Sequence, residues 1–244
     1  NSIRKSHWNQ ERGLFTDSVY DGKQSTVFTE FSNALTLLYG IADAEQTRRV
    51  QANLVKPPQD LARVSPLYFH YVIEALLAVG ESDYAWSYMS QKWAPAMNEM
   101  EDPFITEEWD WRRASPCHGG GAGVVWTLST HALGVYPLEP GHRRVRIAPR
   151  TGALTWAKGV VPADCGDIHV AWRKEGQRFT VSVDLPADVA GEIALPVTKA
   201  KDFSVKLDGR VLDLRSLSIV PASTGSECLI PISGGKHSAE IAPR

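Results

Sequence analysis

The residues best suited to chemistry gather in one stretch, 101–123, which reads EDPFITEEWDWRRASPCHGGGAG. It brings carboxylates, arginines and a histidine together with two tryptophans, Trp109 and Trp111. A glycosidase needs such a set, because an acid and a base flank the glycosidic bond while an indole covers the apolar face of a sugar. A surface loop of solvated charges with two half-buried tryptophans has the same composition, so composition alone leaves both interpretations open.

Other chemistries have less support in this stretch. Gly119, Gly120 and Gly121 resemble a phosphate-binding loop, but neither a Lys-Ser/Thr ending nor the GxGxxG pattern is present. His118 has no partner at metal-ligand spacing, so no metal site is predicted. Cys117 adjoins His118, yet sequence neighbours rarely hold the geometry of a nucleophile and its base, so we expect a buried, inert thiol. The glycines instead indicate a close backbone approach to a ligand or a neighbouring segment.

The segments that must position this stretch change character near residue 136. Before that point, apolar residues come in blocks of helical period. Periodicity and capping residues predict helices over 25–39, 44–54, 65–79, 81–100 and 121–133. The third of these starts with Ser65 and Pro66, a helix-initiating pair, and is apolar nearly all round, which is typical of a helix buried among others.

After residue 136, short alternating runs rich in β-branched residues predict strands over 145–148, 168–172, 179–185 and 192–195. Prolines and glycines separate these runs at roughly the 8–12-residue spacing of an all-β sandwich. The sequence therefore predicts an α+β multidomain protein, with a helical domain over 1–135 and a C-terminal antiparallel β-sandwich over 136–244. Helices followed by strands favour two juxtaposed units over alternating βαβ units.

Length and composition describe an ordinary globular protein. The 244 residues, 43% hydrophobic and 22% charged, suit one large domain or two of average size. A net charge of −2 gives no electrostatic footprint for nucleic acid or anionic lipid. No apolar run is long enough to span a membrane, and the first residues lack the apolar core of a secretory signal, so the compartment stays open. Three cysteines, an odd number, indicate neither a disulfide framework nor a zinc site.

Three stretches carry a family resemblance. They read SPLYFHYVIEALLAVGESDYAWSYMSQKWAPAMNEMEDPFITEEWDW, then SPCHGGGAGVVWTLSTHALGVYPLEPG, then VRIAPR followed by GDIHVAW. In this order they resemble the C-terminal half of bacterial-type α-L-rhamnosidases, glycoside hydrolase family 78, from about residue 12 to residue 200. The resemblance implies that the helices are part of an (α/α)6 barrel that carries the active site and that a C-terminal β-sandwich follows.

The resemblance also implies a catalytic residue. The family motif T-x-W-E-x-W, whose glutamate is regarded as the general base, falls on the segment Thr106-Glu107-Glu108-Trp109. Thr106 stands where the motif has a tryptophan before the glutamate. The base is therefore predicted at Glu107, with Glu108 as the alternative.

Four further residues would form the sugar pocket. The family histidine that follows a serine-rich turn falls on His118, although Gly119 and Gly120 replace its usual neighbours. By the same resemblance, Trp109 and Trp111 would stack on the sugar, while Asp110 and His118 would bind its hydroxyl groups. This chemistry requires no cofactor and no metal.

One family feature does not occur in the 244 residues. It is the acidic stretch, an Asp-Glu-Arg…Gly-Trp…Gly-Asp run, that carries the general acid. An inverting glycosidase needs an acid and a base about 6.5–9.5 Å apart, with water between them. We therefore expect a fragment or truncated form of an inverting enzyme that releases terminal α-L-rhamnose from glycosides, inactive when isolated. Uncovered apolar helix faces would bind the missing N-terminal part of the barrel or a second copy of the chain.

Two other functions fit the same residues. A non-catalytic carbohydrate-binding or interaction protein would keep the scaffold without the acid, and it would bind rhamnosides without turnover. A different enzyme on a helical barrel, such as an unsaturated-uronyl hydrolase, would differ from a rhamnosidase in its activity on a panel of glycosides. In each case we expect neither nucleic acid nor a membrane as partner.

Overall fold

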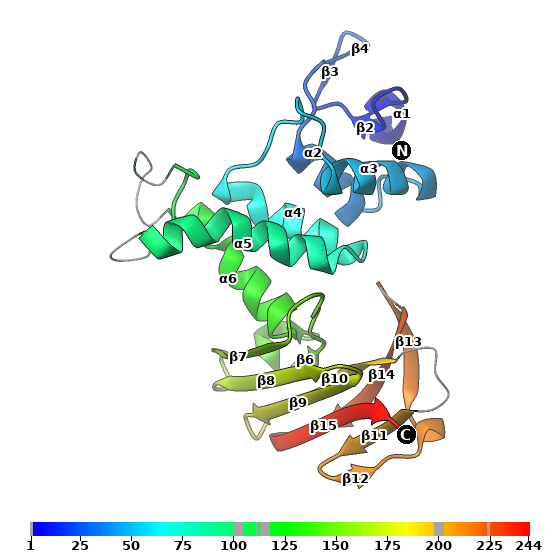
Figure 1. Ribbon diagram of the computed structural model, residues 1–244, viewed down its shortest axis with the longest axis vertical. Coiled ribbons are helices and arrows are strands. Elements are labelled where there is room, and N and C mark those ends of the chain that lie inside the picture. Colours follow the sequence, from blue (N-terminus) through cyan, green and yellow to red (C-terminus); the bar gives the residue numbers. More distant parts are fainter. Residues whose placement is uncertain (1, 100–104, 111, 113–117, 198–202, 224) are drawn as a thin grey trace. The chain divides into compact units, whose positions relative to one another are not determined.

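The computed structural model describes residues 2–99, 105–110, 112, 118–197, 203–223 and 225–244. The chain divides into two compact units, Asn1–Trp126 and Thr127–Arg244. Helices dominate the first unit and strands the second (Figure 1). The α+β class predicted from the sequence is confirmed. Helical structure continues to Ala132, and the strands of the two large sheets begin at Val135.

The first unit begins with short elements that no sequence pattern indicated. They are α1 (Ser2–Ser6) and two antiparallel strand pairs, β1 (Trp8–Asn9) with β2 (Leu14–Phe15) and β3 (Val19–Tyr20) with β4 (Lys23–Gln24). Asn33 ties this segment to the helices, because its side chain accepts from Phe15 N and donates to Phe15 O. Strands of two residues are too short to show alternation, which is why they left no signal.

Four longer helices form the body of the first unit. They are α2 (Glu30–Leu38), α3 (Ala44–Val55), α4 (Pro66–Ala78) and α5 (Ser82–Glu99). The predictions over 44–54, 65–79 and 81–100 correspond to the last three. The helix predicted from residue 25 begins only at Glu30, because Thr29 has extended backbone angles and its hydroxyl accepts a hydrogen bond from Ser32 N. A threonine in this role ends the preceding extended segment and starts the helix.

The apolar helix α4 lies at the centre of the first unit. Helices α2 and α5 pack against it, and a 3₁₀ turn, η1 (Gly119–Ala122), lies against it as well. Phe69, Ile73 and Leu76 are among its fully buried side chains. The expectation that a helix apolar on nearly every side is enclosed by other elements is therefore confirmed.

The helix predicted over 121–133 consists of three short pieces. After η1 come α6 (Gly123–Thr127) and a single π-helical turn, η2 (Leu128–Ala132). The end of η2 is fixed within the second unit, where the indole N–H of Trp172 donates to Ala132 O at 2.7 Å.

Two sheets make up the second unit. The smaller contains, in spatial order, β13 (Ser218–Ala222), β14 (Gly225–Ile232), β10 (Ala190–Val197), β6 (Arg144–Ile147) and β5 (Val135–Pro137). The larger contains β12 (Arg210–Val211), β11 (Phe203–Leu207), β15 (Gly235–Pro243), β9 (Arg178–Leu185), β8 (Ile168–Glu175) and β7 (Trp156–Val161). The four predicted strands correspond to β6, β8, β9 and β10.

One strand pair departs from the expected antiparallel arrangement. Strands β6 and β10 run parallel, with Val145 opposite Gly191. The chain leaves β6, forms β7, β8 and β9 in the larger sheet and returns to β10, so both strands enter the smaller sheet in the same direction. The other strand pairs that the structure describes are antiparallel.

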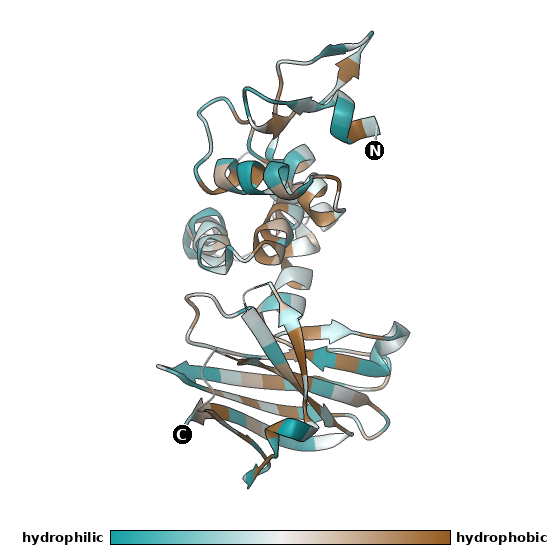
Figure 2. Cartoon of the chain, turned by 90° about the vertical axis from the view of Figure 1, so that its right-hand side faces the viewer, coloured by the Kyte–Doolittle hydropathy of each residue, from teal (hydrophilic) through white to brown (hydrophobic). Residues whose placement is uncertain are grey.

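The two sheets share one hydrophobic cluster. Ile147 and Ile193 of the smaller sheet and Trp172 and Val181 of the larger sheet are buried members of it. Along β9, buried residues alternate with more exposed ones, and Figure 2 shows such alternating bands on the strands of this unit. Successive side chains of a strand point to opposite faces, which produces the period of two from which the strands were predicted.

A half-buried histidine in η2, His131, predicts a pH-dependent stability. Burial lowers the pKa of His131 to about 4, and the charge of Arg150 acts in the same direction. As the pH falls below about 6.5, the unfolded chain takes up a proton that the folded protein does not bind. We expect this residue to lower the free energy of unfolding of the second unit by about 1–3 kcal/mol between neutral pH and about pH 4.

Chemical denaturation of the full chain at several pH values measures this effect. The variant His131→Gln should lose that part of the pH dependence. Ser129→Ala, a change in the same helical turn, keeps the histidine and should keep the full pH dependence. If the His131→Gln protein followed the same pH curve as the unsubstituted chain, the half-buried neutral histidine would not be its cause.

Candidate active site

Glu107 lies within a short turn, segment 105–109, whose two ends are anchored by hydrogen bonds. At the first end, His118 N donates to Ile105 O at 2.9 Å. At the second end, the indole Nε1 of Trp109 donates to Val64 O at 2.7 Å. The turn that carries Glu107 is therefore fixed to two segments that are distant in the sequence.

Thr106 gives the turn its internal order. It is only 2% exposed, and its hydroxyl donates to Glu108 O at 2.8 Å. Glu107 and Glu108, which follow it, are both exposed. The threonine that replaces the motif tryptophan thus occupies a buried position directly before the two candidate bases.

Glu107 lies close to His118. Its Oε1 atom is 3.9 Å from His118 Nε2, and the two side chains are 48% and 35% exposed. The other ring nitrogen, His118 Nδ1, is buried and has no hydrogen-bond partner among the described residues. A carboxylate and an imidazole placed this way can both hydrogen-bond to one water molecule or one sugar hydroxyl.

Trp109 is held from several sides. Its ring packs edge-on against Phe69 and Trp93, with centroids 5.0 and 5.4 Å away. Lys92 Nζ lies 5.3 Å from its ring centroid, within the range of a cation–π contact. With its N–H bonded to Val64, the indole is half-buried and anchors the turn. Its stacking on a sugar stays a prediction.

The structure places two of the other predicted residues, Asp110 and His118, in this region. Asp110 follows Trp109 directly and is exposed. His118 is the residue that precedes η1 and faces Glu107. Trp111 lies outside the described residues.

Two glycines allow η1 to approach this turn closely. A Cβ atom on Gly121 would lie 2.5 Å from Ile105 Cγ2 and 2.9 Å from Thr106 O, and one on Gly120 would lie 2.0 Å from Leu67 Cδ1. Such distances are shorter than real carbon contacts. The expectation that the glycines permit a close backbone approach is therefore confirmed, and the neighbour is the turn itself together with the start of α4.

A buried carboxylate that no sequence pattern identified lies behind the anchor at Val64. Glu30 is fully buried; its Oε2 atom accepts from Val64 N at 3.0 Å, and its Oε1 atom lies 3.0 Å from Arg63 Nε. Tyr88 donates its hydroxyl to the same carboxylate at 3.2 Å. Burial raises the pKa of Glu30, and Arg63 and the Val64 N–H partly oppose that shift. An acid in the first turn of a helix is common, so its sequence context gave no signal.

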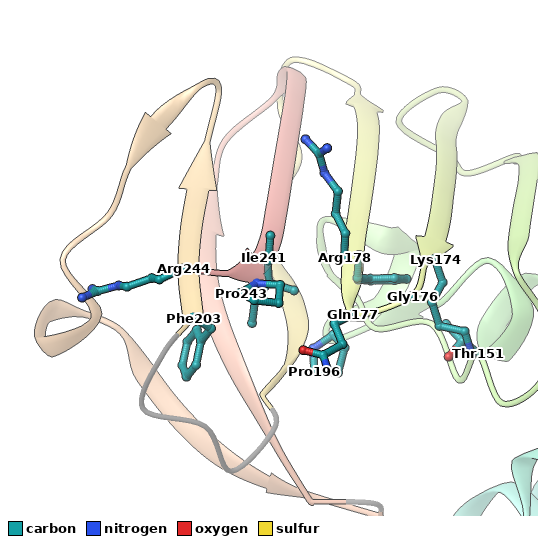
Figure 3. Close-up of a pocket in the computed structure, with 12 residues that line it drawn as sticks. Thr151, Lys174, Gly176, Gln177, Arg178, Pro196, Phe203, Ile241, Pro243 and Arg244 are labelled. Atoms are coloured by element: carbon teal, nitrogen blue, oxygen red, sulfur yellow. The ribbon is translucent and has the colours of Figure 1, made fainter.

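A pocket in the second unit lacks the groups for this chemistry (Figure 3). It encloses about 340 Å³ and is lined by Phe179, Phe203 and Ile241, with Arg178 and Arg244 nearby. Its lining includes no carboxylate and no histidine. It offers no carboxylate–histidine pair, whereas the turn around Glu107 brings a carboxylate and an imidazole to 3.9 Å within the stretch that the sequence singled out, and this turn is the candidate site.

Neither a metal centre nor a membrane segment is found in the described ranges. No group of three or more His, Cys, Asp or Glu side chains there is arranged to hold a metal ion. The helices of the same ranges are too short or too polar to cross a bilayer.

Comparisons with known protein sequences identify the second unit. Residues 134–210 match the bacterial α-L-rhamnosidase C-terminal domain. An α-L-rhamnosidase of Alteromonas sp. (strain LOR) is 35% identical over 213 residues, which cover 78% of this chain and 23% of that protein. The chain thus spans about a quarter of the length of this relative.

Solved structures share the fold. The α-L-rhamnosidase of Dictyoglumus thermophilum matches 98% of this chain and 27% of its own, with a TM-score of 0.70 and 16% identity. The family 78 rhamnosidase of Bacillus sp. GL1 matches 80% of this chain and 22% of its own, with a TM-score of 0.68 and 25% identity. The Streptomyces avermitilis α-L-rhamnosidase, solved with L-rhamnose, matches 93% of this chain and 22% of its own, with a TM-score of 0.66 and 18% identity.

These similarities place the chain among relatives of glycoside hydrolases. The resemblance seen in the sequence is confirmed, because the chain is related to a C-terminal part of the α-L-rhamnosidases of glycoside hydrolase family 78.

The close packing of η1 gives a prediction for Gly121. In Gly121→Ala the new methyl group collides with Ile105 and with Thr106 O, so the turn must shift. We expect this variant to lose about 1–3 kcal/mol in the free energy of unfolding, measured by chemical denaturation. Gly119→Ala is the matched control, because a Cβ atom there meets nothing within 4 Å, and it should change stability by less than about 0.5 kcal/mol. Equal losses in the two variants would contradict the packing described here.

Proposed function

We propose that this chain is the C-terminal part of an inverting α-L-rhamnosidase that releases terminal α-L-rhamnose from glycosides. In this proposal the helices belong to an (α/α)6 barrel, and the two sheets form the C-terminal β-sandwich that follows near residue 136. The observation that carries the proposal is the anchored turn, which presents an exposed Glu107 beside His118 at the position of the family's general base.

Glu107 acts as the base in the proposed reaction. Its exposed carboxylate takes a proton from a water molecule, whose oxygen attacks the anomeric carbon on the face opposite the leaving group. His118 and Asp110 hydrogen-bond hydroxyl groups of the sugar, and Trp109 and Trp111 cover its apolar face. An acid outside this chain protonates the leaving oxygen.

Exposed apolar side chains in the first unit support a protein partner that covers them. Tyr68, Met97, Val125 and Trp126, all in the first unit, are 42–54% exposed. Exposed apolar residues of this size favour a covering partner. In the proposal that partner is the rest of the barrel, and a second copy of the chain is the alternative.

Two substitutions test which glutamate is the base. In a complete, active enzyme that contains this chain, Glu107→Gln keeps the side chain's shape but removes its proton acceptor, so kcat should fall by about 10²–10⁴ while KM changes little. Glu108→Gln should have a milder effect, because two consecutive exposed residues project differently. Steady-state kinetics on an aryl α-L-rhamnoside provides the measurement. A larger loss of kcat in Glu108→Gln would identify Glu108 as the base. Full activity in both variants would mean that neither glutamate is the base.

The isolated chain gives a second test. Without its acid partner it should show no more than trace hydrolysis of an aryl α-L-rhamnoside, since general acid–base assistance contributes about 10²–10⁴ to the rate. A purified 244-residue monomer with ordinary turnover would overturn the proposal. Rhamnoside binding without turnover in the full-length gene product would favour the non-catalytic carbohydrate-binding alternative.

A further inference from the structure

We propose that Glu30 is a positioning residue for the candidate base: through Val64 and the indole of Trp109, it fixes the turn that presents Glu107. This inference rests on the proposed role of Glu107 as the base. Glu30 itself is buried and touches neither Glu107 nor solvent in the described structure.

The first link joins Glu30 to the segment that precedes α4. Glu30 N donates to Ala62 O at 2.9 Å, and Ala62 N donates to Phe28 O at 2.9 Å. The Glu30 carboxylate extends the same contact by accepting from Val64 N at 3.0 Å. One residue thus holds segment 62–64 with its backbone and its side chain together.

The second link fixes the carboxylate itself. A fully buried carboxylate is costly unless it is paired and hydrogen-bonded. Arg63 Nε pairs with one carboxylate oxygen, and Tyr88 donates its hydroxyl to both. The guanidinium also lies 4.7 Å from the ring centroid of Tyr88. With these partners in place, the oxygen that accepts from Val64 has a defined position.

The third link runs from Val64 to the turn. Both backbone groups of Val64 are bonded: its N–H to Glu30 and its C=O to the indole of Trp109. Trp109 is two residues from Glu107, and Ile105, at the other end of the turn, is held by His118 N. A shift of Val64 therefore moves one anchor of the turn while the other stays, which rotates Glu107 away from His118.

Two substitutions separate this role from that of a buried charge pair. Glu30→Gln loses the charge but keeps an acceptor that reaches Val64 N, and Tyr88 can accept from the new amide. Glu30→Asp keeps the charge but is one methylene shorter, so its oxygens withdraw from Val64. If Glu30 acts by position, the Asp variant is the more disruptive one; if it acts only as the partner of Arg63, the Gln variant is.

The indole N–H resonance of Trp109 reports the outcome in the 244-residue chain labelled with ¹⁵N. The signal is assigned as the one that Trp109→Phe removes. We expect Glu30→Asp to shift it and to speed its exchange with solvent by about tenfold or more, and Glu30→Gln to leave it near its original position. Asn33→Ala is the matched control, because Asn33 is equally buried in α2 but bonds Phe15 and Thr29, so it should destabilise the unit without moving the signal.

An unchanged indole signal in Glu30→Asp, or an equal change in Glu30→Gln, would overturn the positioning role. If the positioning role holds, Glu30→Asp should also lower kcat of the complete enzyme by about 10–10² with little change in KM, because a misplaced base slows the reaction and leaves binding intact. An altered indole signal with unaltered kcat would also overturn it. If instead Glu107→Gln leaves activity intact, the proposed function fails. The structural link from Glu30 to Trp109 would still be tested by the indole N–H signal, which does not depend on activity.

Discussion

The candidate site depends on one hydrogen bond, the 2.7 Å contact from the indole of Trp109 to Val64 O. It joins the turn that carries Glu107 to the segment before α4, 45 residues earlier in the chain. Burying the Val64 carbonyl without a donor, or the Trp109 N–H without an acceptor, would cost folding free energy. Each group therefore needs the other as its partner. The rings of Phe69 and Trp93 pack edge-on against the same indole and help to fix its orientation.

The segment that accepts this bond is itself held by a buried carboxylate, which is an unfavourable place for a charge. Glu30 is fully buried, and its carboxylate is tolerated because Arg63, Tyr88 and Val64 N all face it. Replacing such a group by an apolar one of similar volume is often neutral for stability, so a stability requirement alone does not explain its presence. What an apolar residue could not do is hold Val64 at a fixed distance and angle. The geometry required at the site therefore accounts for a residue that the packing of the helices does not require.

The second unit follows a different principle. Its strands are held by one hydrophobic cluster to which both sheets contribute, and the end of η2 is bonded to the strand region by Trp172 Nε1 on Ala132 O and by Arg150 N on His131 O. The pocket around Phe203 and Ile241 is lined by no Asp, Glu or His side chain, and residues 134–210 of this unit match the C-terminal domain of bacterial α-L-rhamnosidases. The family model thus matches the second unit, whereas the residues proposed for catalysis and sugar binding lie in the sequence of the first unit.

The sequence by itself determined the elements whose signals are local. Periodicity over a dozen residues predicted α3, α4 and α5, alternation predicted β6, β8, β9 and β10, and the family resemblance implied roles for Glu107, Trp109 and His118. Only the structure decided the rest: the late start of α2 at Glu30, the two-residue strands before it, the parallel pairing of β6 with β10, and the burial of Glu30. The parallel pairing and the burial of Glu30 depend on partners far away in the chain. A hydrogen bond or buried charge that joins residue 30 to residue 64, or residue 64 to residue 109, leaves no periodic trace in the sequence around either partner, because neither residue's neighbours contribute to it.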